Sequence, residues 1–458
     1  MSTSPGAGPA PLGLAGIIRL GLVQTALGAI VVLTTSTLNR VMVVEFALPA
    51  VLPGALVGIH YAVQILRPRW GYGSDTGGRL TPWIVGGMGI LALSGAAAAA
   101  GTALVGTSPI AGVAIAMLAF LGIGVGVGAA GTSLLVLLAK RVHPDRRAAA
   151  ATIVWVMMIG GFIVTAGAAG QLLDPFSPAR LVTVASVVSV IAFSLTLVAV
   201  WGVEGPAVPK RNPVSTSAGA PEATFREALA QVWAEPEARH FAVFVFVSML
   251  AYSAQDLILE PFAGTVFGFT PGESTKLAGV QHTGVLIGMT VVGIAGSGRL
   301  GKRLGSMRGW AIGGCLASAV ALTTLALGSL HGPGWPLRAC VMALGVTNGA
   351  YAVAAIGSMM GLASRGRESR EGVRMGLWGA AQAIAFGLGG FAGTLASDVA
   401  RAFLGSPVDA YATVFALEAL LFVASALLAA RVHPSRIEET AIEMAQGGAS
   451  LAPAEARR

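Results

Sequence analysis

The sequence predicts an all-α integral membrane protein with twelve transmembrane helices. Apolar residues make up 55% of the chain and charged residues only 11%, against roughly 25% charged residues in soluble domains. The apolar residues gather in long runs, and a bilayer core takes about 20 apolar residues per helix. We expect the helices at residues 17–38, 47–66, 83–104, 109–139, 148–170, 181–203, 240–267, 276–296, 309–330, 336–362, 375–397 and 410–430.

A long polar segment divides these helices into two sets of six. Residues 204–239 begin with a run rich in Pro, Ser and Gly and continue with TFREALAQVW, which we predict as a short amphipathic helix in a cytoplasmic linker. This helix could lie on the membrane, on the protein's own surface or against a partner. The linker separates a six-helix bundle at 17–203 from a second one at 240–431, and tails at 1–16 and 432–458 complete the expected organisation.

The distribution of charge among the loops predicts the orientation in the membrane. The loops after the second, fourth, eighth and tenth predicted helices hold 15 Lys and Arg, whereas the loops on the opposite side hold five. Because cytoplasmic loops are enriched in Lys and Arg, we expect these four loops and both termini in the cytoplasm. The cations are spread over separate short loops, so we expect no nucleic-acid binding.

No arrangement typical of an enzyme or a metal site is recognisable in the sequence. We find no nucleophilic serine with a matching histidine and acid, no paired catalytic carboxylates and no phosphate-binding loop. Cys315 and Cys340 fall in predicted helices without a CxxC spacing, so we expect neither a disulfide nor a metal centre. GVGAAG at 126–131 matches a dinucleotide motif without a preceding strand. We expect its glycines, with Gly122 and Gly124, to form a close helix contact.

Two of the basic loops carry related motifs, about 223 residues apart. The first loop fits G-x-x-x-D-R-x-G-R-R, and the second fits its latter part, with Gly298 in place of the acid. The matching residues are Gly71, Asp75, Gly78 and Arg79 in the first loop, and Arg299, Gly301, Lys302 and Arg303 in the second. This pattern resembles the major facilitator superfamily. The resemblance implies two six-helix bundles around a central cavity, with the motif as a cytoplasmic latch between helices.

Three longer segments carry a more specific resemblance. They are TLNRVMVVEFALPA at 37–50, HYAVQILRPRWGYGSDTGGRLTPWIVGG at 60–87 and QDLILEPFAGTVFGFTPGEST at 255–275. They resemble the bacteriochlorophyll-delivery family of the PucC and LhaA type. The resemblance implies a protein of the inner photosynthetic membrane of a bacterium that delivers bacteriochlorophyll to light-harvesting antenna polypeptides, with pigment-synthesis enzymes and membrane lipids as further partners. A secondary transporter of another amphiphile and an assembly scaffold that binds no pigment are the alternatives.

Two histidines within predicted helices are the candidate pigment ligands. Bacteriochlorophyll is a flat amphiphile whose magnesium accepts an axial nitrogen or oxygen, and neutral histidine suits that position. His60 and His282 lie 222 residues apart, nearly the offset of the two loop motifs, so we expect similar depths in the two halves. The alternative is that each histidine is only hydrogen-bonded within the protein. Gln64 and Gln281 are the nearby partners in that case, and further candidates for contact with pigment.

A second group of polar residues is predicted toward the outer side of the membrane. Asn39, Arg40 and Glu45 follow the first predicted helix, whereas Asp256 and Glu260 lie one turn apart on the seventh. Charged groups near a membrane span usually find a partner. We therefore expect Arg40 to pair with Asp256 or Glu260 across the two halves, as a gate or a structural clasp. Both carboxylates are expected near the interface rather than deeply buried.

Overall fold

A computed structural model describes residues 12–64, 79–143, 146–204, 233–295, 306–363 and 371–431. These residues form α-helices and two π-helical segments, η1 and η2. The elements are α1 (Leu14–Val32), η1 (Leu33–Thr37), α2 (Leu38–Arg40), η2 (Val41–Glu45), α3 (Val51–Val63), α5 (Thr81–Leu104), α6 (Pro109–Arg141), α7 (Arg147–Leu172), α8 (Pro178–Val200), α10 (Pro236–Phe267), α11 (Pro271–Ala295), α13 (Met307–His331), α14 (Leu337–Ala363), α15 (Glu371–Leu404) and α16 (Pro407–Arg431).

The described helices confirm the predicted all-α membrane architecture. Eleven helical stretches are long and apolar enough to cross a membrane, and the shorter apolar helix α3 adds a twelfth. The longest departure from the predicted bounds is in the first span. We expected it to end at residue 38, but a continuous helix runs from Leu14 through η1 and η2 to Glu45. Polar residues near its end are buried inside the protein, where hydrogen bonds satisfy them, so they do not terminate the helix.

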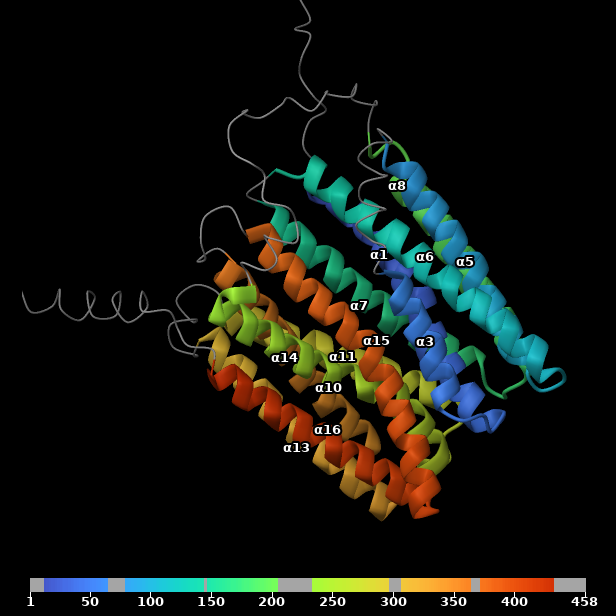
Figure 1. Ribbon diagram of the computed structural model, residues 1–458. Coiled ribbons are helices and arrows are strands. Elements are labelled where there is room, and N and C mark those ends of the chain that lie inside the picture. Colours follow the sequence, from blue (N-terminus) through green and yellow to red (C-terminus); the bar gives the residue numbers. More distant parts are fainter. Residues whose placement is uncertain are drawn as a thin grey trace, which may run out of the picture.

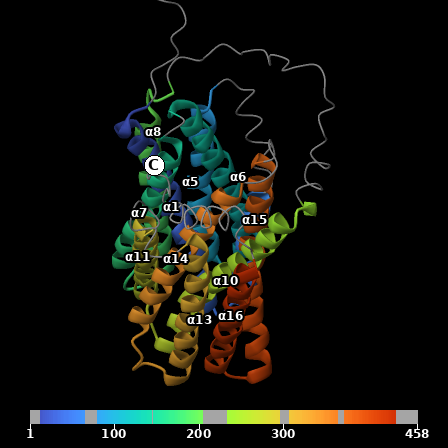
Figure 2. The ribbon, with the colours of Figure 1, turned by 90° about the vertical axis from the view of Figure 1, so that its left-hand side faces the viewer.

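The helices form two groups, each with its own hydrophobic core. We refer to residues 12–204 as the N-terminal half and residues 233–431 as the C-terminal half. One core joins buried side chains from Ile17 to Val203, with a single contribution from Leu257, and the other joins side chains from Ala238 to Ala429. Figure 1 shows the two groups, with α3 next to α15 and α7 next to α11 where they meet. Figure 2 shows the same separation from a second direction.

The two halves are joined toward one end of the bundle. This end, the short-loop end, is where the loops at 46–50, 105–108, 173–177, 268–270, 332–336 and 405–406 connect the helices. The opposite end is called the basic end. Between described residues, the hydrogen bonds that cross from one half to the other all lie toward the short-loop end. The charge distribution predicts that the basic end faces the cytoplasm.

Glycines allow neighbouring helices to pack with their backbones close together. A Cβ atom at Gly126 would lie 2.7 Å from the carbonyl oxygen of Gly87 on α5, and one at Gly124 would lie 2.6 Å from the carbonyl oxygen of His60 on α3. Gly122 packs against Ser94 in the same way. The expected helix contact of this glycine run is therefore confirmed, and it fits α6 between α5 and α3.

At the basic end, Glu204 caps the N-terminus of α5. Its carboxylate accepts hydrogen bonds from the backbone amides of Leu80 and Thr81, the latter at 2.9 Å, and Arg79 lies 3.9 Å away. Burial raises the pKa of the Glu204 carboxyl, but these hydrogen bonds and the charge of Arg79 outweigh it, so the pKa lies below its usual value. The carboxylate therefore stabilises the folded protein at neutral pH.

We expect Glu204→Gln to lower the free energy of unfolding by about 1 kcal/mol, the usual contribution of a capping side chain. Because the folded pKa is depressed, the stabilisation is present above the unfolded pKa and is lost as pH falls through the folded pKa. The melting temperatures of variant and wild type in detergent should therefore converge in acid. Glu237→Gln, an exposed first-turn carboxylate of α10, is the control, and a difference that persists unchanged at low pH would contradict the assignment.

Candidate functional site

A layer of hydrogen bonds connects the end of the first membrane helix to the C-terminal half. Asn39 donates its side-chain amide to the carbonyl oxygen of Leu257 on α10, and Ser36 donates its hydroxyl to Glu260. The hydroxyls of Thr37 and Thr275 lie 3.0 Å apart. All three contacts come from η1 and α2, beside the two π-helical segments, and such segments are frequent at functional sites. The polar residues of this helix therefore form part of the junction between the halves.

Arg40 extends this junction to the loop between α10 and α11. Its side chain is only 2% exposed, forms an ion pair with Glu45 and donates a hydrogen bond of 2.6 Å to the carbonyl oxygen of Phe269. A Cβ atom at Gly264 would lie 3.0 Å from the guanidinium, so a glycine leaves the space that Arg40 occupies. A single buried guanidinium thus connects η2 to the opposite half.

The predicted ion pair between Arg40 and a carboxylate of α10 is wrong. Arg40 pairs with Glu45 instead, five residues further on, and residues five apart lie one above the other on a π-helix. Glu260 accepts from Ser36, and Asp256 accepts a hydrogen bond of 3.2 Å from Gln281. Glu260 is also only 2% exposed, rather than close to the interface as we expected.

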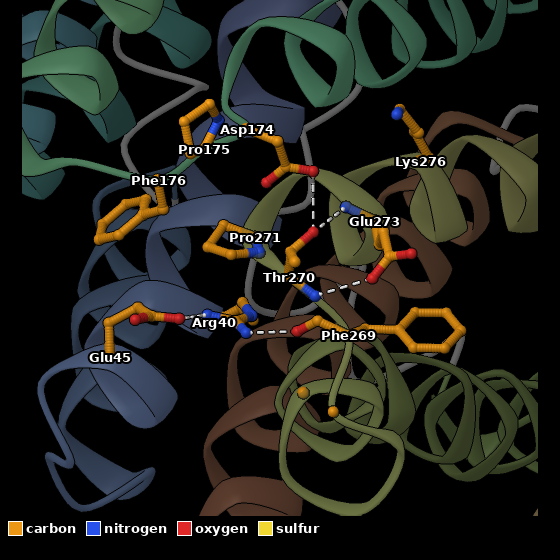
Figure 3. Close-up of a pocket in the computed structure, with 12 residues that line it drawn as sticks. Arg40, Glu45, Asp174, Pro175, Phe176, Phe269, Thr270, Pro271, Glu273 and Lys276 are labelled. Carbon is orange, nitrogen blue, oxygen red and sulfur yellow. Dashed lines mark hydrogen bonds and ion pairs between the residues drawn. The ribbon is translucent and has the colours of Figure 1, made fainter. Parts of the chain in front are cut away.

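A pocket opens at the short-loop end, where these contacts meet. It has a volume of about 770 Å³, and Figure 3 shows Arg40 between Glu45 and Phe269 on one side of it. Its wall combines two cations with three carboxylates, and with aromatic and proline side chains. The lining residues are Arg40, Glu45, Asp174, Pro175, Phe176, Gly264, Gly268, Phe269, Thr270, Pro271, Glu273 and Lys276. Charges of both signs are present, so the lining has no evident preference for a ligand of one charge.

His60 is buried and held by a neighbouring side chain. The residue is 2% exposed, and its Nε2 atom lies 2.9 Å from the side-chain nitrogen of Gln64, one turn along α3. This is the hydrogen bond that the spacing predicted as the alternative to pigment ligation. An imidazole whose Nε2 atom is already bonded to an amide is poorly placed to ligate a metal through that atom.

His282 has a different environment, half-buried between α11 and α7. Its Nδ1 atom lies 2.8 Å from the carbonyl oxygen of Ala278, and its ring meets that of Phe162 edge to face at 4.7 Å. Because a carbonyl oxygen only accepts, Nδ1 carries the proton, and a neutral ring then has its lone pair on Nε2. Metal-ligating histidines commonly have this arrangement. Gln281 bonds to Asp256 and not to His282, so its expected role as the partner of His282 is wrong.

The predicted latch falls mainly outside the described residues. Of its members only Arg79 is described, and it lies beside Glu204. Gly71, Asp75, Gly78, Arg299, Gly301, Lys302 and Arg303 lie outside the described ranges, so the latch stays a prediction.

Three acidic residues that join parts of the fold were missed in the sequence. Glu204 caps α5, and Asp174 and Asp398 accept hydrogen bonds from helix N-termini of the opposite half. The two aspartates lie 224 residues apart, close to the offset of the loop motifs, and this spacing was a usable signal. Glu204 directly follows the sixth span and has no such counterpart to reveal it.

Solved structures with a similar fold are transporters. The nucleoside transporter NupG matches with a TM-score of 0.64 at 12% identity, over 92% of this chain and 99% of its own. A bacterial homologue of the human lysosomal transporter Spinster, in an inward-facing conformation, matches with a TM-score of 0.62 at 16% identity, over 91% and 95%. At such low identity these likenesses show the fold alone, which is of the major facilitator type.

Sequence relatives define the family. A protein of Rhodobacter capsulatus called bacteriochlorophyll synthase 44.5 kDa chain is 52% identical over 93% of this chain and 97% of its own length. Protein PucC of the same organism is 29% identical over 90% of both chains. The family model described as PUCC protein matches residues 37–437. The match covers most of the chain and agrees with the three sequence segments noted above, so this chain belongs to the PUCC protein family.

Proposed function

We propose that the protein binds bacteriochlorophyll within the membrane and delivers it to light-harvesting antenna polypeptides. The observation that carries the proposal is the family membership, together with a relative at 52% identity whose name refers to bacteriochlorophyll. A photosynthetic inner membrane, with the basic end and both termini in the cytoplasm, is part of the proposal. Antenna polypeptides are the primary partners, and pigment-synthesis enzymes are further candidates.

The proposed role is not catalytic, although that relative's name contains the word synthase. Two observations support a carrier. The similar folds belong to transporters, and the sequence has no recognisable set of nucleophile, base and acid. A pigment-handling subunit would act in the same process as a synthase without performing its chemistry.

His282 fits the axial position of the pigment better than His60. Bacteriochlorophyll supplies a magnesium ion that accepts a nitrogen ligand when it is bound. The hydrogen bond from Nδ1 of His282 to Ala278 leaves the lone pair on Nε2, whereas Nε2 of His60 is engaged by Gln64. His282 would therefore hold the magnesium, and the ring of Phe162 would fix the plane of the imidazole.

The proposal is tested by gentle purification of the protein from pigmented membranes. The absorption spectrum and the co-purifying polypeptides are recorded from the same sample. We expect a bacteriochlorophyll absorption band and antenna polypeptides together. A colourless protein with stable antenna partners would instead identify an assembly scaffold. Flux of another amphiphile across sealed vesicles, without bound pigment, would identify a secondary transporter, the alternative that the fold favours.

A further inference from the structure

Asp174 connects the N-terminal half to the first turn of α11. Its two carboxylate oxygens accept hydrogen bonds from the hydroxyl of Thr270, at 2.8 Å, and from the backbone amide of Gly272, at 3.1 Å. A Cβ atom at Gly272 would lie 2.3 Å from this carboxylate and 2.4 Å from the carbonyl oxygen of Gly170. The ends of α7 and α11 therefore touch at the backbone, with the carboxylate beside the contact.

Asp398 forms the corresponding contact from the C-terminal half. Its two oxygens accept hydrogen bonds from the backbone amides of Ala50, at 3.0 Å, and Val51, at 2.7 Å, at the N-terminus of α3. A Cβ atom at Gly54 would lie 2.0 Å from the hydroxyl of Thr394, one turn before Asp398. The ends of α15 and α3 thus meet in the same manner as those of α7 and α11.

The two contacts are related by the internal repeat. Asp174 and Asp398 lie 224 residues apart, and the amides that they cap, at Ala50 and Gly272, lie 222 residues apart. Each aspartate lies at or just after the end of one helix and caps a helix of the other half, where N-terminal amides favour a negative charge. A matched pair on either side of the junction restrains the two halves symmetrically.

We propose that Asp174 and Asp398 form a paired gate that holds the short-loop end closed and releases it when both caps break. The contacts that cross the junction at this end are mostly hydrogen bonds from polar groups, which water can replace when the end opens. Each cap contributes about 1 kcal/mol, so the closed end is reversible. The inference goes beyond pigment handling, because it concerns which end of the bundle opens, whatever the cargo is.

Spin-label distances at both ends test the gate in the full chain. Cys315 and Cys340 are first replaced by alanine, and a labelled pair is placed on exposed positions of the two halves. Thr107→Cys and Ala402→Cys report on the short-loop end, and Arg146→Cys and Arg431→Cys report on the basic end. Electron double resonance then gives the distance distribution of each pair, with no pigment required.

In the double variant Asp174→Asn and Asp398→Asn, each amide keeps the size of the carboxylate but can accept at only one of its two former oxygens. We expect the short-loop pair to gain a longer-distance population and the basic pair to gain a shorter one. Either single variant should give a smaller change. Asp409→Asn, an exposed carboxylate of the same end in the first turn of α16, should leave both distributions unchanged.

Unchanged distributions in a folded double variant would overturn the gate. A longer short-loop distance without a change at the basic end would also overturn it, because that result is local loosening and not rocking of the halves. Should the double variant not fold, Gly272→Ala provides the same test with every charge kept, since its Cβ atom would displace the Asp174 carboxylate. A wild-type distribution in Gly272→Ala would equally reject the gate.

Discussion

Gly288→Ala is expected to lower the free energy of unfolding by about 1 to 3 kcal/mol, the usual effect of overpacking a close contact. The added Cβ atom would lie 2.0 Å from the carbonyl oxygen of Val346 and 2.8 Å from the amide nitrogen of Ala350 on α14. These are backbone atoms and cannot rotate away, so α11 and α14 must separate along part of their length. Thermal unfolding of the purified protein in detergent measures the effect.

The reason for a large effect is that the contact is reciprocal along both helices. Gly284 and Gly288 lie four residues apart on α11, and Gly345 and Gly349 lie four apart on α14. A Cβ atom at any of them would approach a carbonyl oxygen of the facing helix within 2.4 Å. Small residues at this spacing let membrane helices pack at the backbone, so one methyl group disturbs the whole seam.

The same helix offers a matched control. A Cβ atom at Gly293 of α11 would meet nothing within 4 Å, and the residue is exposed. Gly293→Ala should leave the stability unchanged or raise it by up to about 1 kcal/mol, because alanine favours a helix. Equal melting temperatures for Gly288→Ala and Gly293→Ala would show that the close approach of α11 and α14 has no bearing on stability.

The number of helices could be predicted from sequence because it depends on a simple physical quantity. A membrane span needs a minimum length of apolar residues, and eleven stretches plus α3 satisfy it where the sequence predicted them. The end of the first span could not be predicted in this way. Asn39 and Arg40 resemble residues of a loop, but they lie inside the helix because Leu257 and Phe269 of the other half accept their hydrogen bonds.

Contacts within one helix were more predictable than contacts between helices. The bond between His60 and Gln64 follows from their spacing of four residues. The partner of Arg40 depends on the rotation of the helix about its axis, which the π-helical turns of η1 and η2 change. Hydropathy carries no record of that rotation. The aspartates of the proposed gate are recognisable only when the internal repeat is applied to single polar residues.

We expect His282→Phe to shift or remove the absorption band of co-purified bacteriochlorophyll, and His60→Phe to leave it largely unchanged. Phenylalanine keeps a ring of similar size beside Phe162 but has no nitrogen for magnesium. In His60 the Nε2 atom is already engaged by Gln64, so its loss should act on packing and not on the pigment. The spectrum and the pigment-to-protein ratio of each purified variant are compared with those of the wild type.

His331→Phe supplies the control, because His331 lies at the short-loop end of α13, exposed and beside Trp335. Its spectrum should equal that of the wild type. A changed band for His60→Phe alone would move the ligand to α3 and require Gln64 to release the imidazole. Unchanged spectra for both His60→Phe and His282→Phe would reject histidine ligation while leaving pigment binding in place. The magnesium would then take its axial ligand from elsewhere, and the shape of the cleft would hold the pigment.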